Sequence, residues 1–123
     1  MKPKASPARA CLNSFRHAFR GLWMVFKTQR NARIHALATI AVVAGGCVCG
    51  VSRGEWCLLV FACAGVCSAE AMNTALEQLA DAVTLERHPL IGRAKDAAAG
   101  AVLVMAIAAA VVGIFVFLPH IFG

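Results

Sequence analysis

The sequence predicts an all-α integral membrane protein with three transmembrane helices and an N-terminal amphipathic helix in front of them. Hydrophobic residues make up 60% of the 123 residues and charged residues only 15%, whereas soluble proteins average about 45–50% and about 25%. The apolar residues gather into long uncharged runs. A soluble domain of this length has too small a core to cover so many apolar side chains.

The N-terminal part is expected to form a helix that lies in the membrane interface. Residues 1–8, with Pro3 and Pro7, are expected to be loose. Over residues 10–33, apolar side chains recur at helical spacing and polar ones fall between them, which is typical of an interfacial helix. The apolar set is Leu12, Phe15, Phe19, Leu22, Trp23 and Phe26.

Three membrane helices are expected over residues 36–52, 56–83 and 97–119. The first is a run of 17 uncharged residues and the third a run of 23, against about 20 needed to cross a bilayer. The second is uncharged from Trp56 to Ala69 and then continues through polar residues. We therefore expect residues 1–123 to form a single membrane domain.

Positive charge is concentrated on one side of these predicted helices. Residues 1–35 hold eight of the 12 Lys and Arg residues and no acid, and the loop 84–96 holds three more. Because cytoplasmic loops are enriched in Lys and Arg, the N-terminus and the loop 84–96 are expected in the cytoplasm. A basic arm can also bind nucleic acid, but beside membrane helices an orientation signal is favoured, so no nucleic-acid partner is expected.

A row of polar side chains continues the second membrane helix. Its members share one helix face because of their spacing, and they are Glu70, Asn73, Thr74, Glu77 and Asp81. A carboxylate at bilayer depth costs about 2.5–3.5 kcal/mol on insertion scales, so an interaction must offset it. The row fits a Mg²⁺ site, in which a few carboxylates act together with substrate phosphates. It fits equally a polar seam between the helices of an oligomer.

The next segment, ERHPLIGRAKD, favours the metal site. It brings further charged side chains to the same membrane level, namely Glu86, Arg87, His88, Arg93, Lys95 and Asp96. Cations there can bind phosphate oxygens, although an orientation signal alone would also explain them. Together with the acids they indicate phosphoryl transfer from ATP to a membrane-held acceptor. A small multi-pass transporter and a non-catalytic membrane subunit are the alternatives of another class.

The run EAMNTALEQLAD, followed by HPL, AKDAAAGAV and a terminal FLP, resembles the small prokaryotic lipid kinases of the diacylglycerol kinase and undecaprenol kinase family. The resemblance extends back through FRHAFRGL and RNARIH and is closer to the undecaprenol kinase branch. It implies an ATP- and Mg²⁺-dependent homotrimer in the bacterial inner membrane, with active sites shared between subunits. The acceptor it implies is a lipid alcohol, undecaprenol, with diacylglycerol as the alternative.

The resemblance also implies roles for individual residues. Glu70 matches the general base that takes the proton of the lipid hydroxyl. Glu77 matches a magnesium ligand, and Gln29 stands where the family has a glutamate as a second ligand. Because an amide brings no negative charge, it attracts Mg²⁺ less strongly; either the protein tolerates a weaker site, or a neighbouring residue compensates, or the enzyme is slow. Nucleotide contacts are implied for His17, Gln29, Glu77, Glu86, Arg87, His88, Lys95 and Asp96. Support of the substrate or the site is implied for Arg9, Asn73, Thr74 and Asp81.

Overall fold

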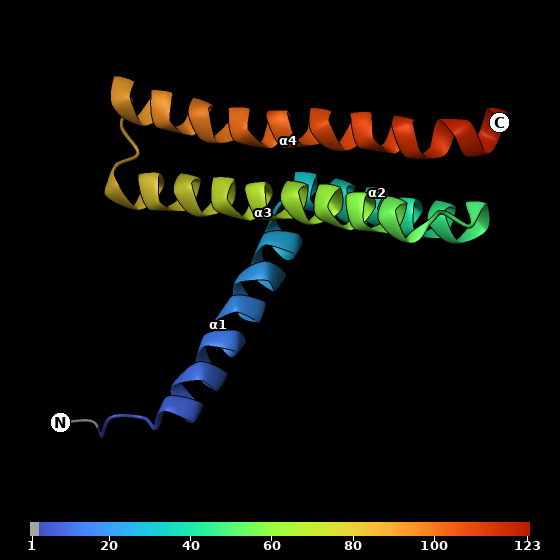
Figure 1. The fold of residues 1–123 in the computed structure, drawn as a ribbon. Helices are drawn as coiled ribbons and strands as arrows, with labels where there is room; N and C mark the ends of the chain where they lie inside the picture. The colour runs from blue at the N-terminus through green and yellow to red at the C-terminus, as the bar shows by residue number, and fades with distance from the viewer. Residues whose placement is uncertain (1–2) are drawn as a thin grey trace.

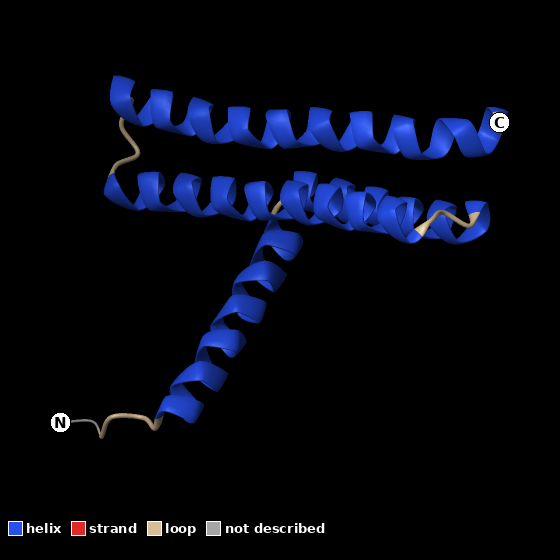
Figure 2. Ribbon diagram, viewed as in Figure 1, coloured by secondary structure: helices blue, strands red, loops and turns tan. Residues whose placement is uncertain are grey.

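The computed structural model describes residues 3–123 as four helices joined by short turns (Figure 1). The helices are α1 (Pro7–Thr28), α2 (Arg30–Cys49), α3 (Arg53–Val83) and α4 (Pro89–Phe122). No strand occurs within residues 3–123 (Figure 2), which confirms the predicted all-α class. Helices α2, α3 and α4 are each long and apolar enough to cross a membrane. Of the segment 1–8 predicted to be loose, residues 1 and 2 lie outside the described residues, and residues 7 and 8 are helical.

A single extended residue, Gln29, separates α1 from α2. Its backbone has φ −106° and ψ 118°, and α1 turns away from the other three helices at this point (Figure 1). The Arg33 guanidinium donates a hydrogen bond of 2.9 Å to the carbonyl of Lys27, which satisfies a carbonyl that the end of α1 leaves free. The helix predicted over 10–33 therefore ends at residue 28, and residues 30–33 belong to α2.

The turn between α2 and α3 is built by local hydrogen bonds. Gly50 ends α2 with φ 65°, a left-handed conformation that glycine adopts without strain. Ser52 and Glu55 then form a capping box, because the Glu55 N–H donates to Ser52 Oγ at 3.2 Å and the Ser52 N–H donates to Glu55 Oε1 at 2.9 Å. Helix α3 consequently starts at Arg53, ahead of the predicted range 56–83.

Helix α4 is longer than the predicted range 97–119 at both ends. It starts at Pro89, a residue that suits the first helical position, and it continues through Pro119. At about 1.5 Å per residue its 34 residues measure about 51 Å, against about 30 Å for the bilayer hydrocarbon. Helices α3 and α4 thus extend together past the start of α2 (Figure 1).

Helix α3 is the central element of the fold. Helix α4 runs antiparallel along it, α2 packs on its first half, and α1 meets α2 and α3 near the Gln29 break (Figure 1). A small buried cluster of Val51, Leu59 and Val116 lies close to the α2–α3 turn, with Trp56 packed against it. This arrangement leaves the polar half of α3 between α1 and the start of α4.

Most large apolar side chains point outward. Phe61 on α3 and Phe115 on α4 are 78% and 76% exposed. Such a surface suits lipid chains or other subunits, because bilayer hydrocarbon is as apolar as these side chains. On α1, Phe15, Phe19 and Trp23 are also exposed, as expected for the predicted amphipathic helix.

Candidate active site

The first part of the polar row is buried where α1, α2 and α3 meet. Glu70 is 3% exposed and Thr74 is 1% exposed. The Thr74 hydroxyl donates to the main-chain carbonyl of Glu70 at 3.0 Å, so it is satisfied within α3. In contrast, Glu70 Oε2 and Asn73 Oδ1 are buried and have no hydrogen-bond partner among the described residues. Because buried polar atoms are costly when unpaired, these oxygens mark a point where a further partner is expected.

Glu70 borders a small cavity of about 150 Å³ between the three helices. The cavity is mostly apolar, and its lining residues are Leu22, Val25 and Phe26 of α1, Ala32, His35 and Ala36 of α2, and Cys67, Glu70 and Ala71 of α3. The nitrogen donor that approaches Glu70 is His35, whose Nε2 lies 3.7 Å from Glu70 Oε2. His35 was absent from the predicted site, because a lone histidine at the start of an apolar helix is a weak signal.

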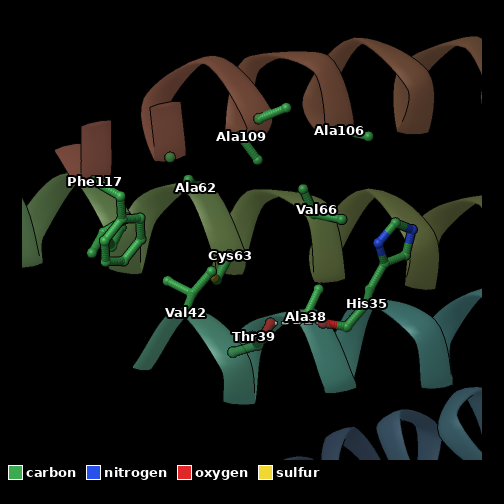
Figure 3. Close-up of a pocket in the computed structure, with 13 residues that line it drawn as sticks. His35, Ala38, Thr39, Val42, Ala62, Cys63, Val66, Ala106, Ala109 and Phe117 are labelled. Atoms are coloured by element: carbon green, nitrogen blue, oxygen red, sulfur yellow. Dashed lines mark hydrogen bonds between the residues drawn. The ribbon is translucent and has the colours of Figure 1, made fainter. Parts of the chain in front are cut away.

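A larger apolar groove starts at the same histidine. It has a volume of about 300 Å³ and lies between α2, α3 and α4. Figure 3 shows His35 at one end of this groove and Phe117 at the other, with Val42, Cys63 and Val66 between them. Through His35, the buried carboxylate of Glu70 is therefore close to this apolar groove, which runs along the membrane helices.

A second candidate region lies at the turn between α3 and α4. A cavity of about 480 Å³ falls within the usual size of small-ligand pockets, about 300–1,000 Å³. Its lining residues are Asp81, Thr84, Leu85, Glu86, Arg87, His88, Pro89, Ile91, Gly92 and Lys95. Lys95 Nζ donates to Asp81 Oδ1 at 2.7 Å, a charge-assisted bond that joins α3 to α4. The structure thus brings five of the predicted site residues together here, namely Asp81, Glu86, Arg87, His88 and Lys95.

The two regions are separated along α3. Asp81 follows Glu70 by eleven positions, which corresponds to about 17 Å at the helical rise. Among the predicted residues that line neither cavity, Arg9 and His17 are exposed on α1, and Asp96 is exposed on α4. Within one chain, the predicted site is therefore divided between two places.

The two residues predicted as magnesium ligands are partly buried and not joined by a hydrogen bond. Gln29 Nε2 donates to Thr28 Oγ1 at 3.4 Å, and Glu77 lies on the polar face of α3. Within residues 3–123, no three His, Cys, Asp or Glu side chains are close enough to hold a metal ion. Mg²⁺ nevertheless needs only one or two carboxylates when waters and substrate phosphates complete its shell. The oxygen donors of Glu77 and Gln29 fit that chemistry.

The fold and the polar residues define a membrane protein with ionisable side chains gathered toward one end of its helix bundle. Comparison with known proteins identifies the kind of protein. Residues 16–117 match the family model of prokaryotic diacylglycerol kinase. The chain is 43% identical to the undecaprenol kinase of Bacillus subtilis over 108 residues, which cover 88% of each chain.

Two diacylglycerol kinases are also similar. The chain is 41% identical to that of Synechocystis over 109 residues, which cover 88% of this chain and 62% of the relative. It is 33% identical to that of Pseudomonas aeruginosa over 85 residues, 69% of each chain. The chain belongs to the prokaryotic diacylglycerol kinase family. It is accordingly a membrane lipid kinase with ATP as its co-substrate. This membership excludes the two alternatives considered from the sequence, a small transporter and a non-catalytic membrane subunit.

Proposed function

We propose that the protein transfers the γ-phosphoryl group of ATP to the hydroxyl of undecaprenol, forming undecaprenyl phosphate and ADP in the bacterial inner membrane. The observation that carries this proposal is the buried Glu70 carboxylate, whose Oε2 lacks a hydrogen-bond partner beside an apolar cavity. A base at this depth can meet a lipid hydroxyl without the lipid leaving the bilayer. The similarity to the Bacillus subtilis undecaprenol kinase supports a polyprenol as the acceptor.

Glu70 acts as the general base in this reaction. Its carboxylate takes the proton of the lipid hydroxyl while the lipid oxygen bonds to the γ-phosphorus. The bond between the γ-phosphorus and the bridging oxygen breaks, and ADP leaves with the electron pair. A positioned base of this kind contributes about 10²–10⁴ in rate. The bilayer holds the acceptor at one depth, so part of the entropic barrier is removed before the reactants meet.

Lys95, Arg87 and His88 bind the phosphates of the nucleotide in the cavity at the α3–α4 turn. These side chains line one cavity of about 480 Å³. Lys95 and Arg87 are cations, which form charge-assisted hydrogen bonds to phosphate oxygens, and His88 adds an imidazole N–H donor. Mg²⁺, when bound through Glu77 and Gln29 together with phosphate oxygens, supplies further neutralisation of the charge on the transferred group.

The active sites are shared between the subunits of a homotrimer. In one chain, Glu70 and the cation-lined cavity are about 17 Å apart along α3, and Arg9 and His17 are exposed on α1. A neighbouring chain could bring these groups to the Glu70 region. The exposed apolar faces of the membrane helices also favour contact with other subunits or lipid.

The N-terminus and the loop 84–96 face the cytoplasm in this proposal. The excess of Lys and Arg in these two segments supports that orientation. It places α1 and the cavity at the α3–α4 turn on the side of the membrane where ATP is available.

A parallel acceptor assay tests the proposal. Purified protein in lipid nanodiscs receives radiolabelled ATP and Mg²⁺, with undecaprenol in one sample and diacylglycerol in the other at equal mole fractions. We expect most of the label on undecaprenol. Label mainly on diacylglycerol would make the acceptor assignment wrong, and label on neither lipid would make the whole proposal wrong.

A further inference from the structure

His35 is placed to act on the buried carboxylate of Glu70. The Glu70 side chain is 4% exposed, and His35 Nε2 lies 3.7 Å from its Oε2. The same Oε2 has no hydrogen-bond partner among the described residues. The remaining side chains that line this cavity are apolar ones and the Cys67 thiol. His35 is therefore the strong donor available to this oxygen within the described part of the chain.

The histidine is also held in a way that lets its ring turn. Its side chain is 23% exposed, and the ring borders both the Glu70 cavity and the apolar groove between α2, α3 and α4 (Figure 3). Among residues 3–123, no hydrogen bond joins a partner to the His35 ring nitrogens. The Thr39 hydroxyl donates instead to the main-chain carbonyl of His35 at 2.8 Å. The 3.7 Å separation is longer than a hydrogen bond, and catalytic hydrogen bonds are often longer before the substrate binds.

We propose that His35 is a positioning residue for the lipid kinase reaction: its Nε2–H donates to Oε2 of Glu70 and turns the other carboxylate oxygen toward the acceptor hydroxyl. The inference rests on the proposed function, because it assigns a role to His35 through Glu70. The cavity around the Glu70 carboxylate offers no other strong donor to fix its orientation, because its remaining lining is apolar apart from the weakly donating Cys67 thiol. Misplacement of a catalytic group by about 1 Å can cost about 10²-fold in rate.

Two substitutions separate this role from simple packing. Glutamine carries its amide N–H at nearly the position of histidine Nε2, whereas asparagine carries it at the position of Nδ1. Both are polar and of moderate size, so His35→Gln and His35→Asn should fold alike. Thr39→Val is the matched control, because Thr39 lies one turn further along α2 and lines the same groove as His35.

The measurement is steady-state transfer to the lipid in nanodiscs, with kcat and the KM for ATP determined separately. We expect His35→Gln and Thr39→Val to keep kcat within about threefold, and His35→Asn to lose about tenfold to a hundredfold in kcat with the KM for ATP unchanged. Equal kcat in the two His35 variants, or an equal loss in Thr39→Val, would overturn the proposal.

An infrared measurement tests the contact without turnover. The carboxylate stretching band that disappears in Glu70→Gln identifies Glu70 in the wild type. That band should shift in His35→Asn and stay in place in His35→Gln. An unshifted band in both variants would overturn the contact. A wild type that phosphorylates no lipid would instead overturn the proposed function, and the band would still show whether His35 reaches Glu70.

Discussion

Replacement of Lys95 by methionine should separate activity from stability. Lys95 Nζ lies 2.7 Å from Asp81 Oδ1, and the two side chains are 37% and 52% exposed. Exposed ion pairs contribute about 0.2–1 kcal/mol, and methionine retains most of the side-chain stem. The loss in unfolding free energy should therefore not exceed about 1 kcal/mol. If the ammonium neutralises phosphate charge in the transition state, its removal should lower kcat by about 10²–10³, or about 2.7–4 kcal/mol.

The assay compares lipid phosphorylation at saturating ATP with thermal unfolding in the same detergent. Arg53→Met is the matched control, because it removes one cation at the start of α3, far from the cavity at the α3–α4 turn. It should leave kcat near the wild-type value. Asp81→Asn removes the negative charge from the same interhelical pair but leaves the ammonium in the cavity, so it should lose less activity than Lys95→Met. If kcat of Lys95→Met stayed within about threefold of the wild-type value, Lys95 would only link α4 to α3 and would not bind phosphate.

Two further substitutions test the magnesium site and the packing of α2. Gln29→Glu adds a carboxylate where a magnesium ligand is proposed, so it should raise the rate of phosphoryl transfer at low Mg²⁺. A rate that stays unchanged throughout a Mg²⁺ titration would count against a metal role for this position. Gly46→Ala would place a Cβ 2.5 Å from the ring of Trp56, so it should destabilise the fold by about 1–3 kcal/mol. Gly100→Ala, which meets nothing within 4 Å, should cause no such loss in a melting curve.

The sequence predicted the helical architecture well because the signals for it are local. Long uncharged runs reveal the membrane helices, and the spacing from Glu70 to Asp81 places the polar side chains on one face of α3. The pairing of Asp81 with Lys95 could not be predicted in the same way. It depends on the register of α4 against α3, which is set by the turn between them.

The break at Gln29 also lies beyond local signals. No glycine or proline stands at this position, and the bond from Arg33 to the carbonyl of Lys27 forms only after the chain has turned. The early start of α4 is different, because a local signal for it exists: proline favours the first position of a helix, and Pro89 is the first residue of α4. His35 was missed because its approach to Glu70 depends on how α2 packs against α3.

The most direct test of the central claim is lipid phosphorylation by Glu70→Gln. The substitution removes the proposed base and also a buried carboxylate, so it should lower kcat by about 10²–10⁴ while leaving the thermal stability equal to or above that of the wild type. Transfer near the wild-type rate would contradict the assignment of Glu70 as the base that activates the lipid hydroxyl.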